Sequence, residues 1–491
     1  NWPVVTFYDG LGRAVQERTE KTNGATQSVV NTVVDALGRV VQAYTAMEES
    51  FSWDFTRPAG WSSRPRVTTA YDALGQAVRS VGGDGATSTA FGSGRLQVTE
   101  DANGHIGLAH TDGQGQVVAV DEALVDYSDV FSDGVWGSGW ARGGTTVETA
   151  GTLVITGTGS YGNQANRSLG VRANDDQGVL VSFRYDPGTV AATLFLHTGT
   201  WNDASYRRLA LMVNGGTIYV HRYEGMSVTE TPLMTLQTGV WYRLLLKVDD
   251  DGTATVVVWE RDNPAIRGVL QETRSAFASR NWAFMTQVHT GVERVDDYSE
   301  LTFHTTEYAY DVLGNLTGVT DALGNVTTMV YNALGRKTSM ADPDMGAWTY
   351  VYDLAGNLTA QTDARGCVTG FTYDGLNRLT GKSTAGATGC GQGPVSYRYD
   401  QAGYGESLGR RTTMTDTSGT TTWSYDVRGR VTHEAKTLQG QPTFHTYTTY
   451  DALDRVVTTT YPDGEVVTTA YNAATQPVAL SGSSSYVSSA V

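Results

Sequence analysis

The stretch that decides the fold is a repeat that becomes regular at Tyr310. It reads Tyr-Asp-Val-Leu-Gly-Asn at 310–315, Tyr-Asn-Ala-Leu-Gly-Arg at 331–336, Tyr-Asp-Leu-Ala-Gly-Asn at 352–357 and Tyr-Asp-Gly-Leu-Asn-Arg at 373–378, so that successive copies start 21 residues apart. Further copies begin at Tyr399, Tyr425, Tyr450 and Tyr471, and the signature also opens the chain at Tyr8, Val34 and Tyr71. Self-similarity at a fixed period predicts a repeat architecture.

Each copy carries the chemistry of a tight turn. Asp or Asn in the second position accepts hydrogen bonds from its own backbone two residues on. Gly in the fifth position supplies positive φ without steric cost. The key turn residues that we predict include Asp9, Gly12, Asp311, Gly314, Gly335, Asp353 and Gly356. Asn377 and Asp454 replace the glycine and tolerate left-handed geometry, whereas Thr475 does not, which predicts an atypical last turn.

A second turn of the form Thr-Asp-x-x-Gly lies between the tyrosine copies, for example at 320–324 and 362–366. The residues between turns alternate in polarity, as in 316–320, which indicates short antiparallel strands. Such a meander twists and cannot stay flat over many strands. We therefore predict an all-β fold that coils as a wide spiral or as a stacked solenoid, with the tyrosine rings of neighbouring hairpins packed against one another.

This motif and period resemble the rearrangement-hotspot (Rhs) or YD-repeat family, which includes teneurins and the shells of insecticidal toxin complexes. The resemblance covers residues 1–125 and 306–491. It implies an antiparallel β-spiral wound around a hollow interior, which in bacterial members often encloses a toxic C-terminal region. The closing segment that precedes such cargo is missing, because Asp342-Pro343 lies within a repeat. No toxin or self-cleavage residue is therefore carried over.

The amino-acid composition disfavours some classes of binding partner. Among 491 residues, 35 are Lys or Arg and 51 are Asp or Glu, which gives a net charge of −16. An acidic surface repels phosphate backbones, so we expect no nucleic-acid partner. The sequence has no apolar run long enough for a transmembrane segment and no signal peptide at its start. Because the repeat is cut at both ends, we expect a segment of a longer polypeptide.

The repeat stops between residues 126 and 305. This region holds most of the tryptophans and longer apolar runs, such as 178–183, 208–213, 241–248 and 254–259. The last two runs flank an Asp-Asp-Asp-Gly turn and predict a hairpin. We therefore expect three parts: spiral at 1–125, an inserted β-sandwich at 126–305 and spiral again at 306–491.

The order of features in the insert resembles concanavalin-like or laminin-G-like jelly rolls. Such domains often bind glycans or serve as spacers, and many hold a structural Ca²⁺ between their first and last strands. The resemblance makes Asp129, Asp296 and Asp297 the candidate ligands, since hard cations prefer carboxylate oxygens. The alternative is a pair of terminal strands with solvated acids.

Aromatic residues in predicted loops of the insert are the candidates for sugar binding, because aromatic rings stack on the apolar faces of pyranoses. These residues are Trp136, Trp140, Trp201 and Tyr206. The alternative is that they cap the sandwich. Trp241 and Trp259 lie in predicted strands and are expected in the core.

The two cysteines, Cys367 and Cys390, lie 23 residues apart in neighbouring predicted strands. An even pair in an extracellular array favours a disulfide, and two free thiols remain the alternative.

Catalytic motifs are missing from the sequence. The stretch 157–162 fits a dinucleotide-binding pattern, but no helix follows it to hold a pyrophosphate. No Gly-x-Ser-x-Gly elbow exists, and the eight histidines never adopt metal-ligand spacing. We therefore expect no enzyme and no cofactor beyond a structural Ca²⁺.

Together these features favour a non-catalytic scaffold, secreted or at the cell surface, with an insert for carbohydrate binding or adhesion. Three alternatives stay open. The chain is an Rhs-type shell whose encapsulated C-terminal toxin lies outside this segment, or a subunit of a surface tube or fibre that self-assembles through exposed strand edges, or a glycosidase through its insert.

Overall fold

The computed structural model describes residues 4–20, 26–50, 55, 62, 64–129, 140–143, 146–149, 152–170, 176–186, 189–198, 207–224, 227–249, 252–273, 282–386, 389–391, 393–472 and 476–487. These residues form 39 β-strands and no α-helix, which confirms the all-β prediction. No membrane-spanning helix is found in this part of the chain.

The first strands build one side of a ring. They are β1 (Val4–Tyr8), β2 (Ala14–Glu20), β3 (Thr26–Val34), β4 (Val40–Tyr44), β5 (Met47–Ser50), β6 (Arg66–Tyr71), β7 (Ala77–Val81), β8 (Thr87–Ser93), β9 (Leu96–Glu100), β10 (Ile106–Thr111) and β11 (Val117–Asp129). Sequence neighbours pair antiparallel, except that β3 pairs with both β4 and β5 and β4 pairs with β6. Short strands between tight turns can pair only with their neighbours, which gives the meander.

The ring continues directly from β11 to β23 (Trp282–Tyr310). These two strands pair antiparallel, with Ala119 opposite Glu307 at one end and Asp129 opposite Tyr298 at the other. The expected domain limits at 126 and 305 both fall inside these strands, so the ring and the insert share them. The three-part division therefore stays a sequence-based prediction.

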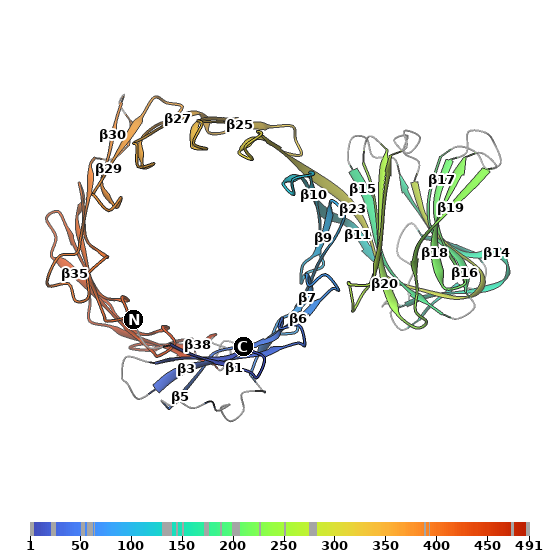
Figure 1. Cartoon of the computed structure of the whole chain (residues 1–491), viewed down its shortest axis with the longest axis horizontal. Helices are drawn as coiled ribbons and strands as arrows, with labels where there is room; N and C mark the ends of the chain where they lie inside the picture. The colour runs from blue at the N-terminus through green and yellow to red at the C-terminus, as the bar shows by residue number, and fades with distance from the viewer. Residues whose placement is uncertain are drawn as a thin grey trace.

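The remaining ring strands follow in sequence order. They are β24 (Leu316–Thr320), β25 (Val326–Tyr331), β26 (Lys337–Asp342), β27 (Gly346–Tyr352), β28 (Leu358–Thr362), β29 (Val368–Tyr373), β30 (Leu379–Ala385), β31 (Val395–Tyr399), β32 (Arg411–Asp416), β33 (Gly419–Tyr425), β34 (Val431–Leu438), β35 (Thr443–Tyr450), β36 (Val456–Thr460), β37 (Val466–Tyr471), β38 (Pro477–Ser481) and β39 (Ser485–Val487). Figure 1 shows that this single meander winds around an open centre. Of the two predicted ways to coil, the structure takes the wide spiral.

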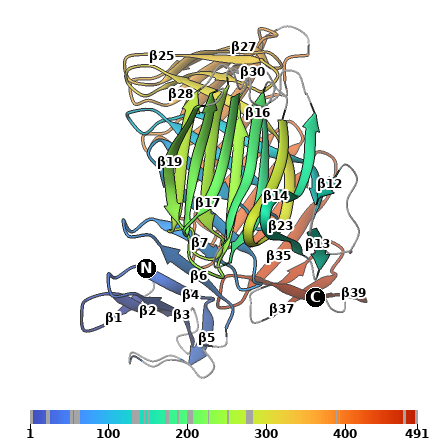
Figure 2. The same ribbon diagram turned by 90° about the vertical axis from the view of Figure 1, so that its right-hand side faces the viewer.

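The insert lies outside the ring, on the side of β9 to β11 (Figure 1). Its strands are β12 (Trp140–Gly143), β13 (Thr146–Thr149), β14 (Thr152–Gly170), β15 (Asp176–Tyr185), β16 (Val190–Thr198), β17 (Arg207–Asn214), β18 (Thr217–Glu224), β19 (Ser227–Thr235), β20 (Trp241–Val248), β21 (Thr253–Glu260) and β22 (Arg267–Thr273). One layer follows the order β23, β15, β20, β21 and β22. The other follows β14, β23, β16, β17, β18 and β19. Figure 2 shows strands of this second layer side by side on the face turned away from the ring.

The layer that contains β15, β20 and β21 is buried on both faces. Val181, Leu244 and Val258 point into a core shared with the second layer. The alternate residues Leu245 and Val257 point into another core, shared with the ring. Strands buried on both faces are apolar throughout, which explains the continuous apolar runs in the sequence.

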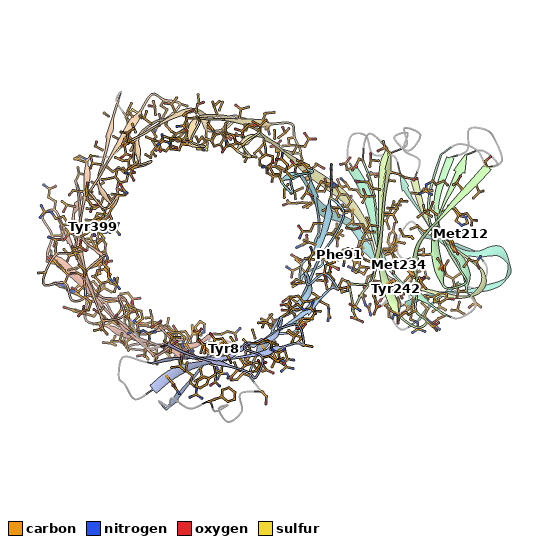
Figure 3. All side chains as sticks on the ribbon, viewed as in Figure 1. Tyr8, Phe91, Met212, Met234, Tyr242 and Tyr399 are labelled. Carbon is orange, nitrogen blue, oxygen red and sulfur yellow. A yellow bond between two sulfur atoms is a disulfide. The ribbon has the colours of Figure 1, made fainter. Side chains whose placement is uncertain are left out.

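The ring contributes its own side chains to that second core. Phe91, Val98 and Leu108, from β8, β9 and β10, are almost fully buried there. The Phe91 ring lies 5.4 Å from the ring of Trp259 on β21, and Figure 3 shows Phe91 on the flank of the ring next to the insert. This apolar contact fixes the insert to the outer wall, since burial of such side chains is the main source of stability.

Candidate functional site

The repeated turn is the smallest unit of the ring. In the turn at 311–315, Oδ1 of Asp311 accepts hydrogen bonds from the backbone N–H groups of Leu313 and Asn315, both at 2.9 Å. The Gly314 N–H donates to the Asp311 carbonyl at 3.0 Å, with φ of 82° at Gly314. The side-chain hydrogen bond from Asn315 is the main cause that lowers the pKa of Asp311.

The other predicted turn residues adopt the same geometry. The glycines have positive φ, namely Gly12 at 77°, Gly335 at 70° and Gly356 at 93°. Asp9 and Asp353 accept the corresponding backbone hydrogen bonds. Asn377 and Asp454 take the left-handed conformation with φ of 60° and 63°. Thr475 lies outside the described residues.

Successive turns are connected by the sixth residue of each motif, as the Arg430 contacts show. Its guanidinium carbon lies 4.7 Å from the ring centroid of Tyr450, and its Nη1 donates to the Asp451 carbonyl at 3.1 Å. The Tyr450 hydroxyl donates back to the carbonyl of Val431 at 2.8 Å. Arginine, tyrosine and backbone thus form one connection between neighbouring hairpins, which we call the Arg–Tyr bridge.

The Arg–Tyr bridge recurs around the ring. The arginine lies over the tyrosine of the next motif in Arg39–Tyr71, Arg336–Tyr352, Arg378–Tyr399, Arg410–Tyr425 and Arg455–Tyr471. The hydroxyl bond to the residue after the previous motif is made by Tyr71, Tyr310, Tyr352, Tyr373, Tyr399, Tyr425 and Tyr471. Instead of the expected stacking of tyrosine on tyrosine, the rings therefore pack under arginine, where cation–π attraction adds to the hydrogen bonds.

The same connection crosses the insert. Tyr310 donates its hydroxyl to the carbonyl of Val117 at 2.9 Å, although 193 residues separate them. Gln116, in the sixth position of its own motif, donates from Nε2 to the Gly314 carbonyl at 3.3 Å. The ring wall is therefore continuous, and the insert interrupts the sequence without interrupting the wall.

Strand register assigns one face of the wall to the interior. Leu301 and Phe303 of β23 point toward the insert, which lies outside the ring, so the alternate residues Tyr308 and Tyr310 point inward. Pairing carries this face from β23 to β37. Large side chains on it are Met329, Met340, Trp348, Tyr350, Phe371, Tyr397, Met414 and Trp423. In Figure 3, no described side chain reaches the centre of the ring.

A buried charge cluster connects the ring and the insert. Nζ of Lys247 on β20 lies 2.6 Å from Asp121 and 2.6 Å from Asp249. Asp176 lies 3.4 Å away, and His110 of β10 contacts Asp121 at 2.9 Å. Burial acts to lower the pKa of Lys247, but the charges of Asp121 and Asp249 outweigh it and raise that pKa. Burial raises the pKa of Asp249 to about 6.

A known protein family matches the C-terminal repeats of this wall. Residues 297–485 match the family model described as Teneurin YD-shell. These residues, which are less than half of the chain, thus resemble the teneurin YD-shell family. The ring is therefore a YD-shell scaffold, as the repeat signature predicts. No curated protein sequence matches the chain.

Solved structures align with low scores. The crystal structure of TcdB2-TccC3-TEV aligns over 97% of this chain and 26% of its own, with 13% identity and a TM-score of 0.30. The Photorhabdus luminescens Tc holotoxin pore gives the same values. The CBM2 module of the evolved Dit protein from Lactobacillus casei BL23 phage J-1 aligns over 37% of this chain and 97% of its own, with 14% identity and a TM-score of 0.30. The YD-shell chain thus spans about a quarter of the two Tc toxin chains, and such scores establish no shared activity.

The acids predicted to bind Ca²⁺ have other neighbours. Oδ2 of Asp297 lies 3.3 Å from the Ser182 hydroxyl and 3.7 Å from Arg243. Burial and the charge of Asp297 raise the pKa of Asp296. The side chain of Asp129 lies outside the described residues. In the described part of the chain, no group of three His, Cys, Asp or Glu side chains could hold a metal ion.

The structure does not test the aromatic residues that we predicted to bind sugars. Trp136, Trp201 and Tyr206 lie outside the described residues, as does the side chain of Trp140, the first residue of β12. Trp259 lies in the core between the insert and the YD shell, with an exposed fraction of 1%. Trp241 is half-buried under Arg261, whose guanidinium carbon is 5.2 Å from its ring.

Two further groups lie on the C-terminal half of the YD shell. Cys367 and Cys390 form a disulfide with a Cα–Cα distance of 5.3 Å. On the outer face, His433 Nε2 and His445 Nδ1 are 2.9 Å apart, and the ring of Tyr447 stacks on His433. Burial and then the charge of His445 lower the pKa of His433. Sequence spacing missed this pair, because antiparallel pairing and not a motif brings the two histidines together.

Proposed function

We propose that the protein is a non-catalytic wall segment of a hollow YD-repeat shell that acts outside the cell. The observation that carries the proposal is the connection from Tyr310 to Val117, which keeps the wall continuous across the insert. The residues of the repeat motif form the turns and the Arg–Tyr bridges of the wall. The disulfide between Cys367 and Cys390 supports an oxidising, extracellular compartment.

Particle shape and size test the wall. Negative-stain electron microscopy of the full chain should show a ring with one lobe on its outside, and light scattering should give the mass of a single chain. A mass that grows with concentration into filaments would favour the tube or fibre hypothesis instead.

We propose that the insert is the recognition module of this wall, directed at glycans or another cell-surface partner. Its support is positional: one layer is buried against the ring through Phe91 and Trp259, while the second layer faces away from the wall. A module fixed in this way presents its far side to an external partner.

A glycan array with the full chain tests this role, with Trp201→Ala as the variant expected to lose binding. The same glycans are then incubated with the protein and analysed for cleavage. Binding without cleavage supports a recognition module. Cleaved products would overturn the non-enzyme proposal.

A second candidate function is enclosure of a polypeptide inside the ring, as a delivery shell does with a toxin. The inner face favours it, because Trp348, Tyr350 and Trp423 present apolar surface there, beside the cations Lys337 and Arg411. Such a surface suits an extended chain that carries both apolar and acidic side chains.

Protease protection tests enclosure. A candidate cargo polypeptide expressed in continuity with this chain should resist a protease that degrades the same polypeptide alone. Equal digestion of both forms would refute enclosure.

A further inference from the structure

A pocket of about 400 Å³ lies on the inner face of the ring, over β27 to β31. Trp348, Gln361, Lys382 and Val395 line it, and strand register places all four on the inner face. It therefore opens toward the enclosed space and away from the insert.

Described residues between β30 and β31 border this pocket. The disulfide from Cys367 to Cys390 attaches them to the residue before β29. Gly391 and Gly393 lie in the lining, and a Cβ at Gly391 would lie 2.8 Å from the Thr384 side chain. A Cβ at Gly393 would come 2.3 Å from Thr417. The two glycines thus allow a close approach that larger residues would prevent.

Two polar side chains in the lining are available to a ligand: the Lys382 ammonium, which only donates, and the Gln361 amide, which donates and accepts. Neither Lys382 nor Gln361 makes a side-chain hydrogen bond or ion pair in the described part of the chain. The Trp348 indole N–H donates to the Met345 carbonyl at 3.0 Å. The indole of Trp348 therefore offers a ligand apolar surface only. The one carboxylate in the lining, Asp363, is already bound by Arg365 at 2.7 Å.

Lysine residues are concentrated on the inner face of the ring. Only five of the 491 residues are lysine, yet Lys337, Lys382 and Lys436 all lie on this face, in a chain with a net charge of −16. The acid Glu434 on the same face accepts a hydrogen bond from Trp423 at 2.7 Å. Lys382 is thus an exposed cation without a carboxylate partner among the described residues of the wall.

We propose that this pocket binds the carboxylate side chain of an acidic polypeptide segment held inside the ring. A carboxylate has only acceptors and would accept hydrogen bonds from the Lys382 ammonium and the Gln361 amide N–H groups, while the methylenes of a glutamate would pack on Trp348. The proposal rests on the second candidate function, enclosure of a polypeptide, and names the chemistry by which the wall holds its cargo.

Fluorescence anisotropy with a labelled peptide of alternating glutamate and glycine tests the proposal on the full chain. The wild type should bind this peptide, and Lys382→Gln should weaken binding about tenfold or more, as expected for a lost charge-assisted hydrogen bond. Trp348→Ala should weaken it as well. The matched control Lys436→Gln, an inner-face lysine outside the pocket, should leave affinity unchanged.

Three results would overturn the proposal. They are equal affinity of the wild type and Lys382→Gln, an equal loss for Lys436→Gln, and equal binding of a lysine–glycine peptide. Glutarate that binds as tightly as the peptide would instead identify a small-carboxylate site and also overturn it. If protease protection of a cargo succeeds while the peptide fails to bind, only the pocket assignment fails; if protection fails while the peptide binds, enclosure alone fails.

Discussion

The buried cluster between ring and insert gives the sharpest prediction on stability. Lys247 has a side-chain exposure of 3% and is the one cation within 4 Å of Asp121, Asp176 and Asp249 together, among the described residues. Lys247→Met keeps most of the side-chain volume but removes the charge that the three carboxylates share and leaves only His110 beside Asp121. Removing one partner of a buried ion pair costs about 3–5 kcal/mol, and we expect a loss in this range near neutral pH.

The loss should depend on pH with a defined sign. Burial already raises the pKa of Asp249 to about 6 in the wild type, so its carboxyl binds a proton more tightly in the folded state. A raised carboxyl pKa gives stability at low pH that is lost as the pH rises from about 4 to about 6. Without Lys247 the three acids repel one another more strongly, so the variant should approach the wild type at about pH 5.

Urea unfolding followed by tryptophan fluorescence measures both effects. Lys436→Met, which removes an exposed lysine, serves as control and should change the free energy of unfolding by less than about 0.5 kcal/mol. Adding Asp249→Asn to Lys247→Met should recover part of the stability. A loss below about 1 kcal/mol near neutral pH, or a loss that does not change with pH, would refute the reasoning.

Three further predictions concern the turns and the Arg–Tyr bridge. Gly324→Val should cost roughly 1–2 kcal/mol and Gly324→Asn much less, because φ is 79° there and a Cβ would meet nothing within 4 Å; equal losses in thermal unfolding would contradict the turn. Arg430→Lys should cost about 1–2 kcal/mol, since lysine cannot stack on Tyr450 and bind Asp451 in the same fork; unchanged urea unfolding would dismiss the bridge. Hydrogen bonding from Arg13 lowers the pKa of Asp9 to about 2. The stability that the turn gains from ionised Asp9 is therefore present above about pH 4 and lost as the pH falls toward 2. NMR titration of Asp9 would show this low pKa.

Local chemistry explains why the turns were predictable. The Asp311 side chain accepts a hydrogen bond from the backbone two residues on, and Gly314 adopts positive φ without steric cost. Neither effect depends on the rest of the fold. The path of the ring was not predictable to the same degree. Spiral and solenoid differ in how twist accumulates over many strands, which no single repeat contains.

The role of the sixth motif residue was missed, although its signal was visible. Arginine recurs there, as in Arg336 and Arg378, and its partner is the tyrosine of the next motif. The sequence shows both residues but not which neighbour they meet. This is why stacking of tyrosine on tyrosine was expected instead.

The insert shows the same limit. The run Leu244–Leu246 predicted a strand, and its unbroken apolar character also signals burial on both faces. That run did not show that the ring covers the second face of this strand. Asp297 stays a predicted Ca²⁺ ligand, and the sequence did not show that Arg243 approaches it from another strand. The pocket around Lys382 has no sequence signal, because five strands and a disulfide bring its lining together.

A disulfide-trapping measurement tests most directly that the repeats before and after the insert form one wall. Ala119 and Glu307 are paired residues of β11 and β23, so Ala119→Cys with Glu307→Cys should form a crosslink across 188 residues of sequence. The control Ala119→Cys with Thr306→Cys shifts the register by one residue and places the thiols on opposite faces. Intact-mass analysis after alkylation should find the new disulfide in the first variant only. Free thiols in the first variant, or crosslinking of both, would contradict a single continuous ring.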